Sequence, residues 1–149
     1  MPVMGAAKFE RFFRAAASLD VDKNDLRRHS EFIGERIYDL LVVGRATAKA
    51  NLRDIIEPFD LPVSKGLQES IHDFRELDED IELKPIMEQL AVWPPLDVAL
   101  SERTQDRLPD IVGGLSVALA RTFKIIDPSL KNPQTREWGQ VFRIFELLL

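Results

Sequence analysis

The residues best suited to metal chemistry are two histidines and a few glutamates at helical spacing. Glu69 and His72 have the Glu-x-x-His spacing, which places both side chains on one face of a helix, as in carboxylate-bridged dimetal bundles. Glu31 and Glu35 lie one turn apart on another predicted helix. Such centres need the Glu-x-x-His pair twice, and His29 has no glutamate three residues before it. We therefore expect these side chains to be surface helix residues that bind no metal.

Nucleophilic and phosphate-binding motifs are also missing from the sequence. The two histidines lie on separate predicted helices, and no serine lies in a glycine-framed turn. Gly113 and Gly114 are not followed by the Lys-Ser/Thr pair of a phosphate-binding loop. The sequence therefore predicts a protein that is not an enzyme, with no catalytic residues, no cofactor and no small-molecule substrate.

The composition is that of a globular, mildly acidic chain. A length of 149 residues with 45% hydrophobic content is enough for one packed domain. The formal net charge of -5 argues against a protein whose whole surface binds nucleic acid. Cysteine is absent, and the longest weakly polar run, residues 111–120, is too short to cross a bilayer. We expect a cytoplasmic protein that is not attached to a membrane.

The first half of the chain reads as a long amphipathic helix between two shorter ones. Residues 22–53 carry apolar or small side chains at three-to-four spacing, and Asp22 or Asn24 can cap the start of this helix. Residues 6–18 form a shorter helix with an aromatic face. A third helix precedes the acidic run 78–80.

The second half repeats this order of elements. A short helix is predicted at 83–92, a long one at 101–126 and a last one at 136–149. Pro109 should kink the long helix, because its ring clashes with the carbonyl four residues earlier. The tripeptide Leu-Asp-Val precedes both long helices.

These repeats predict one compact domain made of two similar halves. The halves are residues 1–77 and 81–149, and residues 78–80 form an acidic join between them. Neither half can bury the apolar stripe of its own long helix. We therefore expect the two long helices to cross antiparallel, with each Leu-Asp-Val segment beside the second loop of the other half.

This order of helices resembles the histone fold. Phe12-Phe13-Arg14, followed by small residues, is similar to the end of the first helix of an archaeal histone. Val21-Asp22 is similar to the loop and helix cap that follow it. Taken whole, the chain resembles the bacterial family in which two histone folds are fused in one polypeptide. The resemblance implies an all-α fold, a tandem pseudo-dimer in which short, long and short helices occur twice.

The resemblance also implies one structural ion pair. In that family an arginine of the second loop pairs with an aspartate seven positions later, and Arg53 and Asp60 have this spacing. In the second half Lys131 falls near the arginine position, but Trp138 stands seven residues later, so no such pair is expected there. We interpret the Arg53–Asp60 pair as a tie that holds the loop to the following helix rather than as a ligand site.

DNA-binding histone folds place basic residues near the starts of their first helices and in their paired loops, where they contact phosphates. The resemblance makes candidates of Lys8, Arg11, Lys23, Arg53 and Lys131. If DNA is bound, Lys8, Arg11 and Arg53 should share one surface. The family has a basic residue and a threonine after the arginine, whereas this chain has Asp54 and Ile55. Binding should therefore be weak and sensitive to salt.

The C-terminal helix suggests a different kind of partner. Phe145, Leu147, Leu148 and Leu149 cannot all face inward on one helix at about 100° per residue. Exposed apolar side chains there favour a homo-oligomer formed through this helix, or another protein partner. The sequence thus leaves two functions open: a weak nucleoid-associated DNA-binding protein, or a protein-interaction or assembly module that does not bind DNA.

Overall fold

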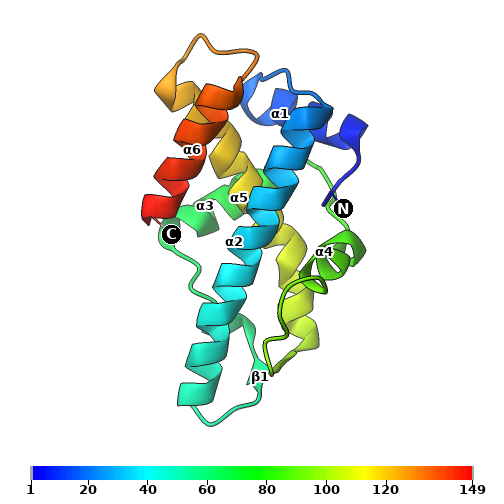
Figure 1. The fold of residues 1–149 in the computed structure, drawn as a ribbon, viewed down its shortest axis with the longest axis vertical. Coiled ribbons are helices and arrows are strands. Elements are labelled where there is room, and N and C mark those ends of the chain that lie inside the picture. Colours follow the sequence, from blue (N-terminus) through cyan, green and yellow to red (C-terminus); the bar gives the residue numbers. More distant parts are fainter. Residues whose placement is uncertain (1, 149) are drawn as a thin grey trace.

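The computed structural model describes residues 2–148 and is built mainly from helices (Figure 1). In chain order the elements are α1 (Ala6–Ala17), α2 (Lys23–Ala50), β1 (Ile55–Ile56), a short 3-10 helix η1 (Pro58–Asp60), α3 (Lys65–Glu76), α4 (Leu83–Leu90), β2 (Ala99–Leu100), α5 (Glu102–Ile126) and α6 (Thr135–Leu148). None of the helices described within this range is long and apolar enough to cross a membrane.

Helix α2 has defined signals at both ends. Asp22 and Asp25 form a capping box, in which each side chain accepts a hydrogen bond of 3.0 Å from the backbone N–H of the other. The helix ends at Ala50, earlier than the predicted residue 53, because Leu52 adopts a left-handed conformation with φ of 60°. The backbone N–H of Arg53 then donates to the carbonyl of Ala48, which closes the helix.

Helix α5 begins as the sequence predicts. The side chain of Ser101 accepts a hydrogen bond of 3.1 Å from the backbone N–H of Thr104. Pro109 lies inside the helix without ending it. α5 therefore remains one continuous helix of 25 residues.

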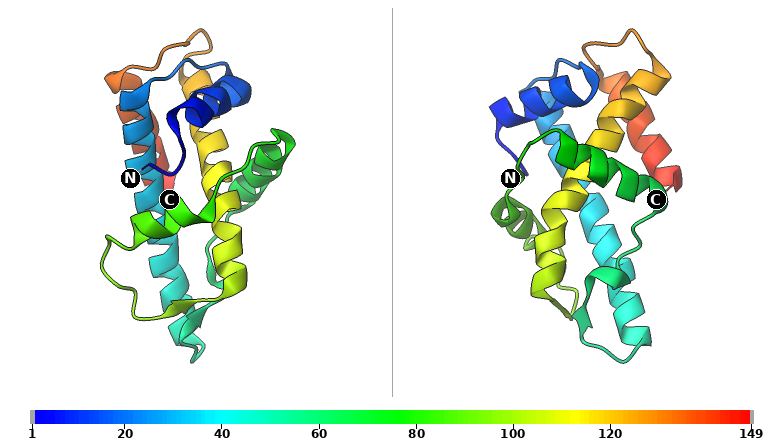
Figure 2. Two further views of the ribbon diagram at one scale, coloured as in Figure 1. Left: turned by 90° about the vertical axis from the view of Figure 1, so that its right-hand side faces the viewer. Right: turned by 180° about the vertical axis from the view of Figure 1, so that it is seen from behind.

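Helices α2 and α5 run in opposite directions and cross at the centre of the molecule (Figures 1 and 2). The loops at their ends pair between the two parts of the chain. At one end the N–H of Asp20 donates to the carbonyl of Lys131 at 2.7 Å. At the other end β1 and β2 form a parallel pair with Ile55 opposite Ala99. Each Leu-Asp-Val segment thus lies beside the second loop of the other half, as the sequence predicts.

Helix α3 lies across α5, as the rear view shows (Figure 2). A glycine pair in α5 allows this close packing. Phe74 covers Gly113 and Ile71 covers Gly114, so closely that a Cβ atom at either glycine would lie 2.4–2.5 Å from them. α3 belongs to the predicted first half and α5 to the second, so this contact joins the two.

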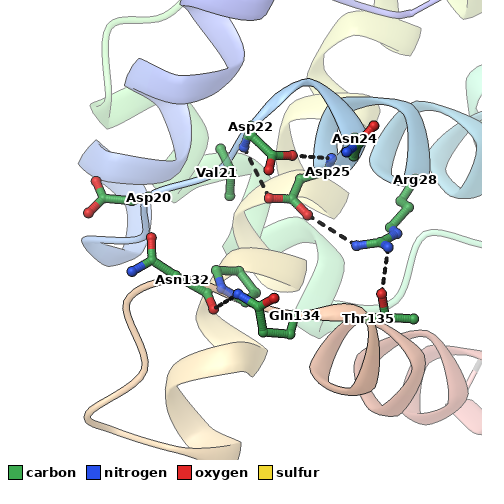
Figure 3. A pocket seen from close by; sticks show the side chains of 10 residues that line it. Asp20, Val21, Asp22, Asn24, Asp25, Arg28, Asn132, Gln134 and Thr135 are labelled. Carbon is green, nitrogen blue, oxygen red and sulfur yellow. Dashed lines mark hydrogen bonds and ion pairs between the residues drawn. The ribbon is translucent and has the colours of Figure 1, made fainter.

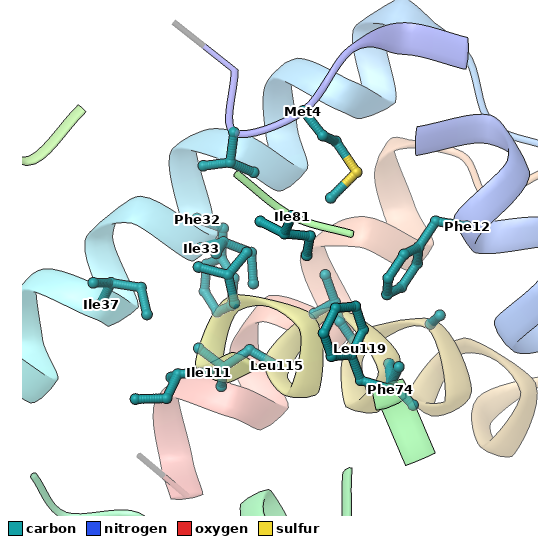
Figure 4. Packing of buried hydrophobic residues seen from close by; sticks show 14 of the residues in the cluster. Met4, Phe12, Phe32, Ile33, Ile37, Phe74, Ile81, Ile111, Leu115 and Leu119 are labelled. Carbon is teal, nitrogen blue, oxygen red and sulfur yellow. The ribbon is translucent and has the colours of Figure 1, made fainter. Parts of the chain in front are cut away.

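One cluster of buried apolar side chains runs through the molecule (Figure 4). Phe12 of α1 stacks with Phe74 of α3, and Leu115 and Leu119 of α5 are buried in the same cluster. Ile81, which follows the acidic join, is buried there too. A core drawn from both predicted halves explains why each long helix can cover its apolar stripe. The residue boundaries of the halves stay a prediction.

Candidate functional site

The two candidate cations of α1 are held by the acidic join. The Nζ of Lys8 donates a hydrogen bond of 2.7 Å to the carbonyl oxygen of Asp80. Arg11 donates two hydrogen bonds, of 2.8 and 3.1 Å, to the carboxylate of Glu79. These bonds, together with the positive charge of Arg11, hold the pKa of Glu79 below its ordinary value. Both cations therefore already have anionic or carbonyl partners within the chain.

Arg53 forms a two-pronged ion pair with Asp60. Its Nη1 and Nη2 atoms each lie 2.6 Å from a carboxylate oxygen of Asp60. The Asp60 side chain is fully buried and also accepts from the backbone N–H of Glu57 at 2.8 Å. The hydrogen bonds from Arg53 lower the pKa of Asp60. The Arg53 guanidinium in turn lies over the ring of Phe59, 5.0 Å from its centroid.

The expectation that Lys8, Arg11 and Arg53 share one surface is wrong. α1 lies beside the first turns of α2, where Phe9 and Phe13 contact His29. Arg53 follows the other end of α2, near β1 (Figure 1). A helix of 28 residues is roughly 42 Å long at 1.5 Å per residue, so the two groups lie near opposite ends of the molecule. The expectation overlooked that residues 6–18 precede the long helix and that Arg53 ends it, so the length of that helix alone separates them.

Lys23 and Lys131 lie at the paired loops beside α1. Lys23 is the first residue of α2, and the backbone of Lys131 accepts the hydrogen bond from Asp20. Neither side chain forms an ion pair with any residue that the structure describes. These two cations are the members of the candidate set that remain free to meet an anionic partner.

The same loops enclose a pocket of about 450 Å³, which we call the loop pocket (Figure 3). Arg28 lies at one side of it, and donates to Asp25 at 3.3 Å and to the Thr135 hydroxyl at 2.6 Å. Burial raises the pKa of Asp25, because little water reaches its carboxylate. Asp20 and Asp22 also line the pocket. Three carboxylates against one guanidinium make this pocket a poor place for a phosphate group.

His29 is a core residue rather than a ligand. It is fully buried, and its Nε2 lies 2.8 Å from the hydroxyl of Ser116. That hydroxyl donates to the carbonyl of Val112, so the ring nitrogen of His29 acts as the donor to it. Burial lowers the pKa of His29 to about 3, which keeps the imidazole neutral at physiological pH.

The Glu-x-x-His pair lies on the outside of α3. His72 lies 3.8 Å from Glu76, and Glu69 lies 3.7 Å from Lys65, with all four side chains largely exposed. Within residues 2–148 no three His, Asp or Glu side chains come close enough together to hold a metal ion. These contacts are made by solvated side chains on a helix surface, where they contribute little to stability.

Helix α6 divides its apolar residues between the core and the surface. Trp138, Val141 and Phe145 are buried, whereas Leu147 and Leu148 are 75% and 80% exposed. Leu149, which the sequence also assigns to this surface, lies outside the described residues. Beside Leu148 is an apolar groove of about 180 Å³ between α3, α5 and α6. It is lined by Ser64, Gly66, Leu67, Ser70, Leu115, Ala118, Phe145 and Leu148. We call Leu147, Leu148 and this groove the α6 surface.

The residues that sequence reasoning missed are Glu79, Asp80 and Arg28. In the sequence the acidic run is interpreted only as a join, and no local pattern signals the pairing, because Glu79 lies 68 residues from Arg11. Arg28 is one of two adjacent arginines on α2, and nothing in the sequence distinguishes the one that reaches the other half.

Comparison with known proteins relates this arrangement to a family and to a fold. Residues 9–146 match the family described as "Domain of unknown function (DUF1931)". A crystal structure of a protein from Thermus thermophilus is 51% identical, with a TM-score of 0.95 over 99% of both chains. A 1.9 Å crystal structure of a protein from Aquifex aeolicus is 22% identical, with a TM-score of 0.81 over 96% of this chain and 94% of the other.

A third solved structure identifies the fold. The histone from Methanopyrus kandleri is 11% identical, with a TM-score of 0.61 over 93% of this chain and 92% of that chain. The expected all-α histone fold is therefore confirmed. The likeness at this level of identity concerns the fold alone.

Proposed function

The chain belongs to the DUF1931 family, and we propose that it is a non-enzymatic histone-fold protein that acts by assembly, joining a second copy of itself through the α6 surface. The observation that carries the proposal is the exposure of Leu147 and Leu148, at 75% and 80%, together with an apolar groove that Leu148 lines. Burying such side chains is worth about 1.5–3 kcal/mol each.

A two-fold contact between identical chains is the arrangement that closes on itself. The same patch then covers its counterpart, and no apolar surface remains to recruit further copies. The groove supplies the concave part of such a contact, and the two leucines supply the protruding part. Because the groove is lined partly by Leu148 itself, both features lie on one surface of one chain.

Cysteine cross-linking tests this proposal directly, because the natural sequence contains no cysteine. A single Leu148→Cys variant should form a disulfide-linked dimer under mild oxidation. Val92→Cys is the matched control, because Val92 is 82% exposed but lies after α4, away from the α6 surface. Equal cross-linking of the two variants, or none at Leu148→Cys, would argue against the proposed contact. The double variant Leu147→Glu/Leu148→Glu should be monomeric with a nearly unchanged melting temperature.

A second candidate function is weak, salt-sensitive DNA binding at the paired loops beside α1. The observation that favours it is that Lys23 and Lys131 flank these loops without an ion-pair partner among residues 2–148. Helices α2 and α6 also begin here, and helix N-termini favour phosphate. The carboxylates of the loop pocket oppose such binding, which is why the affinity should be low.

Binding of a short DNA duplex at several salt concentrations tests the second candidate. Lys23→Ala/Lys131→Ala should flatten the dependence of log affinity on log salt by about 1.8, at 0.9 per lost phosphate contact. Lys65→Ala/Lys84→Ala is the control, because it removes the same charge from α3 and α4. If the two double variants bind alike, these loops do not contact DNA.

A further inference from the structure

The acidic join, residues 78–80, is a structured segment rather than a loose connection. Ile81 anchors its end in the core, where it is 7% exposed (Figure 4). The Glu79 side chain is only 11% exposed, although that of its partner Arg11 is 58% exposed. Asp78 adopts a left-handed conformation with φ of 53°, which turns the chain out of α3. The join is therefore held against α1 at a fixed place.

The contacts of the join are directed at the two outward-facing cations of α1. Glu79 meets Arg11 through both carboxylate oxygens, a geometry that phosphate also adopts with arginine. The carbonyl of Asp80 receives the ammonium of Lys8 at 2.7 Å. These oxygens thus occupy the Nε–H and Nη2–H edge of Arg11, which is the edge a bidentate phosphate would use, and one of the three N–H donors of Lys8.

From this geometry we infer that the acidic join is a built-in anion that closes the α1 cations to polyanions and confines any DNA contact to the paired loops. The inference rests on the second candidate function, DNA binding. It concerns which cations of the protein are available to phosphate, not the assembly through α6.

The physical reason is that the join, as part of the same molecule, competes with phosphate for the α1 cations. A group tethered close to its site has an effective concentration on the order of millimolar or more, which a free phosphate must exceed. A phosphate that displaced Glu79 would also leave that carboxylate unpaired beside it, and like charges at short range repel. A phosphate that displaces Glu79 therefore gains no net neutralisation from Arg11, and Arg11 contributes little to the salt dependence of binding.

Glu79→Gln is the variant that tests the inference, because glutamine keeps the shape of glutamate and removes its charge. Glu82→Gln is the matched control. It changes the net charge equally and lies three residues away, but Glu82 is exposed and forms no ion pair within the part of the chain that the structure describes. Thermal melts establish that both variants are folded before binding is measured.

Two readouts on these variants separate the inference from the DNA-binding function itself. The first is binding of a short duplex: Glu79→Gln should steepen the salt dependence of log affinity by about 0.9–1.8, for one or two added phosphate contacts, and Glu82→Gln should not. The second is the NMR signal of the Arg11 Nε–H group during titration with inorganic pyrophosphate. It should shift in Glu79→Gln at concentrations that leave the natural protein and Glu82→Gln unchanged.

The outcomes are distinct. If no variant binds DNA but pyrophosphate reaches Arg11 only in Glu79→Gln, the DNA-binding function fails and the role of the join stands. If the Arg11 signal responds equally in the natural protein and in Glu79→Gln, the join does not close these cations and the inference is overturned. An unchanged salt slope in Glu79→Gln, when the natural protein binds DNA, overturns it as well.

Discussion

Replacing Gly114 of α5 with alanine should destabilise the protein, whereas the same replacement at Gly139 of α6 should stabilise it. A Cβ atom on Gly114 would lie 2.5 Å from Cγ1 of Ile71 and 3.0 Å from the backbone nitrogen of Ile71. The second contact is with the backbone of α3, so the strain is relieved only if the whole helix moves away from α5. A Cβ atom on Gly139 would meet nothing within 4 Å.

The two effects can be estimated from the same physical terms. Alanine is about 1 kcal/mol more favourable than glycine inside a helix, and this term applies at both positions. Overpacking costs about 1–3 kcal/mol, and backbone contact places Gly114 near the upper value. We therefore expect a loss of about 2 kcal/mol for Gly114→Ala and a gain of about 1 kcal/mol for Gly139→Ala.

Urea unfolding followed by circular dichroism measures both free energies. Each variant should unfold in a single transition with an unchanged dependence on urea, because the amount of surface exposed on unfolding stays the same. A Gly114→Ala variant as stable as Gly139→Ala would contradict the close contact of α3 with α5. That contact joins the two predicted halves, so the result would also weaken the idea of a shared core.

Three further predictions concern the core, the ion pair and the join. The pKa of His29 is about 3 in the folded protein and near 6.5 in the unfolded chain, so the unfolded chain binds more protons below pH 6.5. The free energy of unfolding should therefore fall by about 1.4 kcal/mol per pH unit from pH 6.5 toward 3. Urea titrations at several pH values should show a shallower decline for His29→Gln. Asp60→Asn should cost about 1–3 kcal/mol, because it weakens the buried hydrogen bonds with Arg53; a melt identical to that of the natural protein would argue against this tie. Residues 1–79 and 80–149, expressed separately, should each lack cooperative unfolding, since their apolar stripes cover one another; a cooperative melt of either piece alone would refute this.

Local chemistry made most of the fold predictable from the sequence. Several signals act over only a few residues: the caps at Asp22 and Ser101, the apolar spacing of the helices and the repeated Leu-Asp-Val segments. Such signals predict where the helices begin and which faces they bury. The predicted end of α2 lies three residues too far along. Leu52 occupies a left-handed position that glycine usually takes, so the sequence does not indicate that the helix ends before it.

The candidate site was less predictable, because its properties depend on which distant residues meet. Neither the ion pair of Arg11 with Glu79 nor the hydrogen bond of Arg28 to Thr135 has a local signal, since each links segments far apart in the chain. The exposure of Leu147 and Leu148 was predictable, because helical geometry allows only part of an apolar run to face the core. The apolar groove beside them depends on how α3 crosses α5 and could not be foreseen.

Sedimentation equilibrium of the unmodified protein tests the proposed assembly most directly. At micromolar concentrations we expect a mass near twice 17.0 kDa that falls toward 17.0 kDa when Leu147 and Leu148 are both replaced by glutamate. A mass of 17.0 kDa at every concentration of the natural protein would contradict self-association through α6.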